Sequence, residues 1–257
     1  PRYKLQASPF SPSTDVILGA LLRNPAIAAR VVGTTNVGNR ALSMNVTDAV
    51  AARRSVRGFL DRPVDPALID RLARGAARAP SGGNLQPWHI DIVTGESMAA
   101  LKAMMAEKQA AGLMEAAQYD IYPRELVGPY KDRRFQVGMA LYAALGIERS
   151  DADARNREFR RNFQFFGAPA ALFCTVDRRM GPPQWSDLGM YLQSFMLLAV
   201  EAGLATCAQE CWAIYPETVG AFLGTPPERM VFCGMAIGYE DETAPANRLQ
   251  TERAPEG

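Results

Sequence analysis

A long, almost uninterrupted apolar stretch, Asp187–Gly203 (DLGMYLQSFMLLAVEAG), sets the main constraint on how this chain folds. Apolar residues occupy nearly every side of the helix that this segment would form, so we expect it to lie inside the structure. Gln193 and Glu201 interrupt the stretch, and it is shorter than the about 20 apolar residues needed to cross a bilayer. The segment therefore predicts a buried central helix and not a transmembrane span.

Helices and strands follow one another irregularly along the rest of the chain. Short helices are expected at 47–54, at 66–79 after an Asp65 cap, and at 216–223 between Pro216 and Gly224. Further helical stretches lie near 97–110, 133–146 and 152–162, and apolar runs at 88–93, 170–176 and 230–238 predict strands. Few strands among long helices, without a regular βαβ order, favour an α+β fold.

Residues 1–43 differ in composition from the remainder of the chain. They hold several arginines and a single acid, Asp15, with little helical or strand periodicity, and Met44 begins a segment typical of a natural start. The arginines faintly resemble an organelle transit peptide, whereas the hydrophobic region of a secretory signal is missing. We interpret residues 1–43 as an extension or leader, with an integral element as the alternative, and residues 44–257 as one domain.

The titratable side chains limit the chemistry that the protein offers on its own. Lys+Arg number 28 and Asp+Glu 27, a formal net charge of +1, which argues against a dedicated nucleic-acid binder. A single histidine, His89, excludes His-rich zinc sites and H-E-x-x-H metalloproteases. The four cysteines suit reduced thiols in a reducing compartment such as the cytoplasm; they are Cys174, Cys207, Cys211 and Cys233. We therefore expect the chemistry to come from a bound organic cofactor, without a metal.

Two segments in the first third of the chain carry side chains suited to a ligand. Arg53, Arg54, Ser55 and Arg57 offer donors that match phosphate oxygens, although a short arginine cluster is also typical of a solvated turn. The loop Ala79–Trp88 (APSGGNLQPW) places neutral donors and acceptors beside two glycines, which suits the amide-like edge of a heterocycle. The alternative for this loop is a polar turn that satisfies its own hydrogen bonds.

Two further segments lie after the long apolar stretch. Gly203–Trp212 (GLATCAQECW) places backbone N–H groups and Glu210 in a loop that leaves the core; the alternative is a helix cap at Gly203 with Trp212 as a packing residue. Pro245–Leu249 (PANRL) adds Arg248, either as a phosphate donor or as a surface arginine. The glycine fingerprints of Rossmann and P-loop nucleotide sites do not occur in the sequence.

Together these four segments resemble the FMN-dependent nitroreductase family, in whose order and spacing they occur across residues 47–250. The resemblance implies an α+β homodimer in which an antiparallel sheet lies between helices and two FMN sites form at the subunit interface. It also implies ping-pong transfer of a hydride from NADPH or NADH, through flavin N5, to a small nitroaromatic acceptor, with quinones as a broader class. The flavin would supply the redox chemistry, and the protein would bind and orient the flavin and its substrates.

The same resemblance implies the cofactor contacts. The residues implied at the FMN phosphate are Arg53, Arg54, Ser55 and Arg248, with Arg57 at the N1/O2 edge, where it stabilises reduced flavin. The residues implied to reach the flavin from the other subunit are Pro80, Ser81, Gly82, Asn84 and Gln86, and those that present a backbone N–H to N5 are Gln209, Glu210 and Cys211. Ala246 and Ala208 depart from the basic residue and the proline of relatives, which predicts a weaker phosphate site and a less rigid loop.

The segment Tyr122–Arg134 is rich in Tyr and Arg and is the expected substrate entrance. We expect Tyr130, Arg133 and Arg134 to bind an aromatic or anionic acceptor, with a solvated helix start as the alternative. His89 lies in an alternating strand pattern and is expected to make a structural hydrogen bond, without a part in catalysis. The competing functions are another FMN-dependent reduction such as reductive dehalogenation, a flavin storage protein with little turnover, and an arginine-patch nucleic-acid binder.

Overall fold

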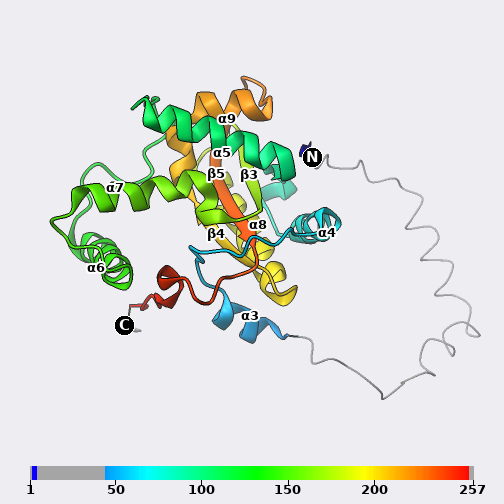
Figure 1. The fold of residues 1–257 in the computed structure, drawn as a ribbon. Coiled ribbons are helices and arrows are strands. Elements are labelled where there is room, and N and C mark those ends of the chain that lie inside the picture. Colours follow the sequence, from blue (N-terminus) through cyan, green and yellow to red (C-terminus); the bar gives the residue numbers. More distant parts are fainter. Residues whose placement is uncertain (1, 5–43, 255–257) are drawn as a thin grey trace, which may run out of the picture. The chain divides into compact units, whose positions relative to one another are not determined.

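The structure is a computed structural model that describes residues 2–4 and 44–254. Its centre is an antiparallel sheet of five strands in the order β1-β2-β3-β5-β4 (Figure 1). The strands are β1 (Arg2–Lys4), β2 (His89–Thr94), β3 (Ala170–Asp177), β4 (Ala205–Gln209) and β5 (Arg229–Gly238). The antiparallel sheet among helices confirms the predicted α+β class.

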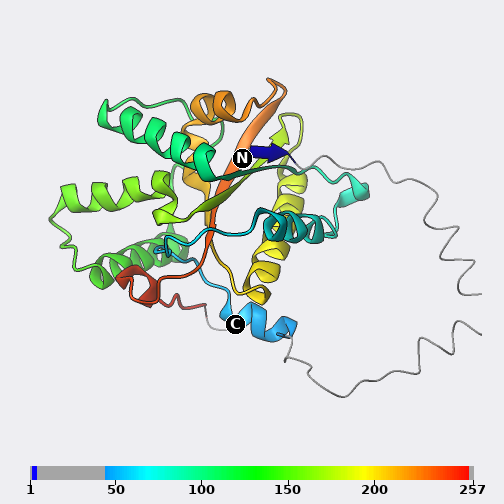
Figure 2. The ribbon, with the colours of Figure 1, turned by 45° about the vertical axis from the view of Figure 1, so that its right-hand side comes forward.

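Helices cover both faces of this sheet (Figure 2). On one face α4 (Pro66–Ala76) and α8 (Pro182–Glu201) pack on the even-numbered residues of β2 and β3, such as Ile92 and Leu172. On the other face α5 (Gly95–Ala110), α9 (Pro216–Leu223) and the 3-10 segment η2 (Arg161–Gly167) pack on the odd-numbered residues of these two strands, such as Val93 and Phe173. Because successive strand residues point to opposite faces, two apolar faces produce the nearly continuous apolar runs seen in the sequence.

Local signals place several helix ends where the sequence predicts them. The Asp65 carboxylate accepts a hydrogen bond from the Ala67 N–H at 2.9 Å and caps α4, and Pro66 occupies the first turn. Helix α9 ends at Gly224, whose φ of 62° is the left-handed conformation that glycine adopts at low cost. Among the described residues no helix combines the length and apolarity needed to cross a membrane.

Other boundaries differ from the predictions. Helix α3 (Val46–Ala52) ends two residues early, whereas α6 (Gly128–Ala144) and α8 each begin five residues early, because Pro129 and Pro182 start them. α7 (Ala152–Arg160) passes into η2. The sequence predicted neither the edge strand β4 nor β1. The predicted leader, residues 1–43, lies outside the described residues except for Arg2–Lys4, which pair with Asp91–Val93 of β2.

The prediction that α8 is buried on all sides is wrong for the described chain. Leu188, Phe195 and Ala199 are fully buried against the sheet, but Gly189 is exposed and Met190 is 37% exposed. Helix α6 has no buried residue at all, although apolar residues recur along it at helical spacing. The sheet, α3 and α4 all contact α8, and the side that carries Gly189 and Met190 stays exposed within the described residues.

Candidate functional site

The segment after α3 runs beside the edge strand β4. Ser55 forms a parallel bridge with Thr206, and the Val56 N–H donates to the Thr206 carbonyl at 3.0 Å. This pairing joins two of the four sequence segments, the arginine cluster and Gly203–Trp212, which are about 150 residues apart in the chain. The backbone of the arginine cluster is therefore anchored to the sheet at Ser55 and Val56, while Arg54 and Ser55 are exposed.

A cavity of about 1060 Å³ opens beside this segment. Its walls come from α3, from the arginine cluster, from α8 and from the C-terminal tail; they include Arg53, Arg54, Ser55, Arg57, Gln193, Gln250, Thr251 and Arg253. Four of the lining residues are arginines and none is acidic, so the cavity favours an anion. Its volume slightly exceeds the about 300–1,000 Å³ typical of ligand pockets, which leaves room for a phosphorylated heterocycle such as FMN.

The arginines in this cavity do not all have free guanidinium groups. Arg54 forms an ion pair with Glu240 at 2.7 Å and also donates to the Asn247 carbonyl, so the C-terminal tail holds it. Arg248 is exposed and is not among the lining residues, whereas Arg253 is. The predicted tail donor therefore lies outside the cavity, and a different tail arginine lines it.

Asn247 joins the tail to the arginine cluster, a role that the sequence analysis missed. Its side-chain Oδ1 accepts from the Arg57 N–H at 2.7 Å, and its Nδ2 donates to the carbonyls of Gly58 and Asp241, both at 2.9 Å. Asn247 is buried within η4 (Pro245–Arg248). The PANRL segment gives no local signal for this role, because Asn247 meets Arg57 and Gly58 across about 190 residues of chain.

The loop Pro80–Gln86 contains the short 3-10 turn η1 (Gly82–Asn84) and three residues at positive φ. These are Gly83 at 56°, Asn84 at 57° and Gln86 at 50°. Left-handed backbone at residues other than glycine is costly and persists only where surrounding contacts hold it. Here Ser81 Oγ accepts from the Gln86 N–H at 2.9 Å, and the buried Asp187 of α8 accepts from the Gly82 N–H at 3.2 Å.

This strained loop presents its polar side chains to the surface. Gly82, Asn84 and Gln86 are exposed, and none of the loop residues lines the arginine cavity of the same chain. Ser81 does satisfy its own turn, as the alternative interpretation of the loop proposed. Asp187, which anchors the loop from the first turns of α8, was not recognised in the sequence because it stands 105 residues away from Gly82.

The segment Gln209–Cys211 leaves the end of β4 and enters η3 (Glu210–Ile214). Gln209 is buried, and its Nε2 donates to the Asn162 carbonyl at 2.7 Å. Partial burial raises the pKa of the Glu210 carboxyl. Burial also raises the pKa of the Cys211 thiol, so this thiol stays neutral and unreactive near pH 7. The four cysteines are free, and Cys174, Cys207 and Cys233 are buried, as expected of reduced core thiols.

Trp212 anchors the Gln209–Cys211 segment by packing among buried aromatic side chains. Its side chain is fully buried, and its ring lies 4.5 Å from that of Phe165 and 5.2 Å from that of Phe163, between centroids. A Cβ on Gly234 would lie 2.4 Å from the indole, so only glycine leaves room for this ring. The packing role considered as the alternative for Trp212 is therefore confirmed.

The predicted substrate segment lies at the start of α6. Tyr130 is exposed, the Arg133 guanidinium is 5.6 Å from its ring centroid, and the Arg134 guanidinium is 4.2 Å from that of Tyr122. None of these residues lines the arginine cavity. They form an exposed aromatic and cationic surface that is suited to a flat anion.

His89 begins β2 and is half-buried. Its pKa is lowered, first because burial disfavours the charged imidazole and second because Arg229 repels it. The imidazole is therefore neutral near pH 7. The His89 side chain makes no hydrogen bond within the described part of the chain, so its structural hydrogen bond stays a prediction.

Comparison with known proteins identifies the relatives of this chain. Residues 50–239 match the Nitroreductase family. The nitrobenzene nitroreductase of Ectopseudomonas oleovorans is 35% identical over 209 residues, which cover 81% of this chain and 92% of that protein. The 4-nitrobenzoate reductase of Pseudomonas putida is 36% identical over 79% of this chain and 89% of its own length.

A solved structure extends this similarity to the fold. The FMN and NADPH-dependent nitroreductase NfnB from Sphigopyxis sp. strain HMH superposes with a TM-score of 0.79 at 52% identity, covering 82% of this chain and 95% of that one. The FMN-dependent NfnB from Mycobacterium smegmatis, solved in complex with NADPH, reaches a TM-score of 0.77 at 29% identity, covering 82% and 96%.

Proposed function

The chain belongs to the nitroreductase family, and on that premise we propose that it is an FMN-dependent NAD(P)H oxidoreductase that reduces nitroaromatic acceptors. The observation that carries this proposal is the acid-free cavity lined by four arginines and Ser55 at the edge of the sheet. When bound, FMN supplies the redox chemistry by accepting a hydride from NADPH or NADH and passing electrons to the acceptor.

The candidate residues divide into two groups, because Arg53, Arg54, Ser55, Arg57 and Arg253 line the cavity, whereas Glu210 and Cys211 do not. We assign the FMN phosphate to Arg53 and Ser55, with Arg253 in place of the expected Arg248, because Arg253 lines the cavity. Arg54 supports them from its ion pair with Glu240. Arg57 and the backbone of Glu210 and Cys211 are assigned to the ring, because the pairing of Ser55 with Thr206 places both segments at one sheet edge.

The exposed surfaces favour a homodimer with its active sites at the interface. Asn84 and Gln86 are exposed and do not line their own chain's cavity, and they lie in a loop whose strain implies a function, so they are assigned to the flavin of a second copy. The uncovered apolar sides of α6 and α8 supply the contact surface for that copy. Residues 44–257 form the FMN-binding unit in this proposal, and its free cysteines favour a cytoplasmic protein.

The acceptor is proposed to be a small nitroaromatic, with quinones as a broader class. The two curated relatives compared above carry nitrobenzene and 4-nitrobenzoate in their names. Tyr130, Arg133 and Arg134 offer an aromatic and cationic surface that suits an aromatic anion in particular.

Colour provides the test of this function. The purified protein, supplied with FMN, is expected to be yellow, to bleach anaerobically on addition of NADPH or NADH, and to recover its colour when a nitroaromatic is added. Recovery only with a halogenated acceptor would indicate reductive dehalogenation, and a yellow protein that never bleaches would indicate storage. A colourless protein that refuses FMN would overturn the proposal.

A further inference from the structure

The backbone of Arg57 is held from both sides by groups that are distant in the chain. On one side its N–H donates to Oδ1 of the buried Asn247 at 2.7 Å. On the other side its carbonyl accepts from Nη2 of Arg161 at 3.1 Å. Arg57, which lines the cavity, thus has both its backbone N–H and its carbonyl bound by side chains, from Asn247 of η4 and Arg161 of η2.

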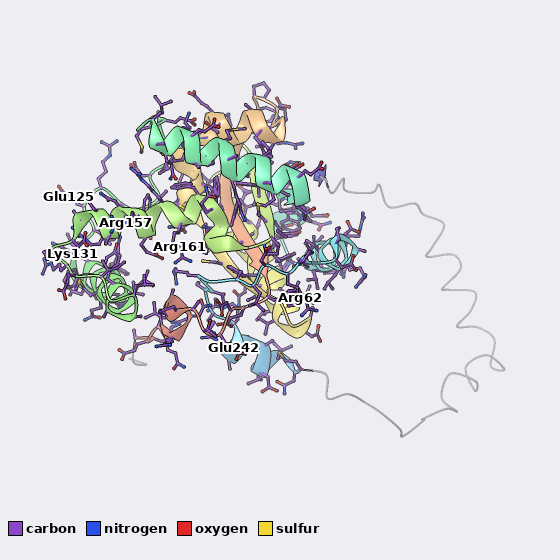
Figure 3. The ribbon with its side chains drawn as sticks, in the orientation of Figure 1. Arg62, Glu125, Lys131, Arg157, Arg161 and Glu242 are labelled. Carbon is purple, nitrogen blue, oxygen red and sulfur yellow. The ribbon has the colours of Figure 1, made fainter. Side chains whose placement is uncertain are left out.

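Arg161 is itself fixed in place. Its Nη1 lies 3.0 Å and 3.3 Å from the two carboxylate oxygens of Glu158, which is buried in the last turns of α7. Its guanidinium also lies 5.7 Å from the ring centroid of Phe166. Figure 3 shows Arg161 between α7 and the chain segment that contains Arg57, whereas Arg157 lies farther out along α7. A guanidinium held by a carboxylate directs its other N–H groups along fixed lines.

The 3-10 segment η2, which begins at Arg161, also holds the Gln209–Cys211 segment. The carbonyl of Asn162, the next residue, accepts from Gln209 Nε2 at 2.7 Å. Phe165 and Phe166, further along η2, have φ of 49° and 55°, a strained conformation that buried aromatic packing maintains. Arg161 and Asn162, at the start of η2, therefore fix the position of Arg57 relative to Gln209, which directly precedes Glu210.

We propose that Arg161, together with Asn247, is a positioning residue for Arg57. This inference rests on the proposed function, in which Arg57 faces the N1/O2 edge of FMN. Two-electron reduction places negative charge at that edge, and a cation that is already held in place stabilises the charge without having to reorganise. Arg161 is not a catalytic residue, because it acts only through the backbone of Arg57.

The experiment compares the affinity of the protein for oxidised and reduced FMN. The ratio of the two dissociation constants follows from the midpoint potential of bound FMN relative to free FMN. Arg161→Ala is expected to lower the preference for reduced FMN about tenfold, the value of one charge-assisted hydrogen bond. Arg157→Ala, which removes the same charge one turn earlier on the exposed side of α7, is the matched control and is expected to leave the ratio unchanged.

A double variant separates positioning from general structure. In an Arg57→Ala background, Arg161→Ala is expected to cause no further change in the ratio, because the group that it positions is gone. If Arg161→Ala does not fold, as judged by circular dichroism, Arg161→Lys retains a single donor group and is expected to give an intermediate ratio.

Two results would overturn the inference: an Arg161 variant that folds and keeps the wild-type ratio, or a further loss of equal size in the Arg57→Ala background. Failure of the proposed function is seen separately, because the wild-type protein would then bind no FMN in either state.

Discussion

At the scale of single residues, the site depends on uncharged and buried groups as much as on its arginines. Asn247 has no chemistry of its own, yet its amide group joins Arg57, Gly58 and Asp241 in one network. Every one of these partners is a backbone group, so the network does not depend on which side chains the neighbours carry. A buried amide with all its partners in place specifies one arrangement of the chain.

Asn247→Ala is expected to destabilise the protein by about 2–4 kcal/mol, because it leaves the partly buried Arg57 N–H without its partner and removes one of the two hydrogen bonds that the Gly58 carbonyl accepts. Urea unfolding, followed by circular dichroism, measures this difference. Asn156→Ala, at an exposed position on α7, is the control and should change the free energy of unfolding by less than about 0.5 kcal/mol. Equal effects of the two substitutions would contradict the role given to Asn247.

Arg134 tests the proposed acceptor surface. Its replacement by alanine is expected to lower kcat/KM for 4-nitrobenzoate by up to about fivefold, because an exposed ionic contact contributes up to about 1 kcal/mol. Neutral nitrobenzene should be affected little. Arg124→Ala, another exposed arginine of the same segment, should spare both substrates. Equal losses for the anionic and the neutral substrate would show that Arg134 does not bind the anion.

At the scale of elements, one carboxylate ties the segment that leads toward α6 to the start of α9. The Glu115 side chain accepts from the backbone N–H groups of Glu217 at 2.7 Å and Thr218 at 3.2 Å, and from the Thr218 hydroxyl. It also pairs with Lys108 at 2.8 Å and is only 5% exposed. An anion at the N-terminus of a helix is favoured, because the first N–H groups have no partner within the helix.

These contacts set a pH dependence for stability. Burial alone would raise the pKa of Glu115, but the hydrogen bonds from Lys108, Thr218 and Glu217 outweigh it and leave the pKa lowered. A carboxyl whose folded-state pKa is lowered stabilises the protein above its unfolded pKa, about 4.3, and loses that contribution as the pH falls through the folded value.

Glu115→Gln is therefore expected to cost about 1.5–3 kcal/mol of unfolding free energy near pH 7, with a difference from wild type that shrinks below about pH 4.3. Urea unfolding across this pH range measures it. Glu107→Gln, at an exposed position on α5, serves as the control. A difference that stays constant from neutral to acid pH would show that the charge of Glu115 is not what holds the segment.

At the scale of the whole molecule, the described chain leaves apolar surface on α3, α6 and α8 uncovered. Val50 of α3, Phe135 of α6 and Met190 of α8 are all exposed. Large apolar side chains gathered on packed elements such as α3 and α8 are typical of a surface that another protein covers. In the proposed homodimer, a second copy of the chain would cover this surface and would also bring its Pro80–Gln86 loop.

Met190→Asp is expected to convert a dimer into a monomer, because a charge in the middle of an apolar interface costs several kcal/mol when buried without a partner. Light scattering coupled to size-exclusion chromatography measures the mass. Met104→Asp is a matched control, since Met104 on α5 is 38% exposed and Met190 is 37% exposed. Dissociation by both substitutions, or by neither, would argue against an interface on α8.

The sequence by itself determined the local features of this protein. The Asp65 cap and the Pro216 and Gly224 ends of α9 could be predicted, because each depends on a few neighbouring residues. The α+β class followed from the order of the helix and strand patterns, and the family from four short segments. Only the tertiary structure decided that Ala205–Gln209 is a strand, because its pairing with β5 and not its composition makes it one. The same holds for Asn247 and Arg161, which meet Arg57 across 190 and 104 residues of chain. Such contacts depend on how the elements pack against one another, and a local pattern of residues does not determine that packing.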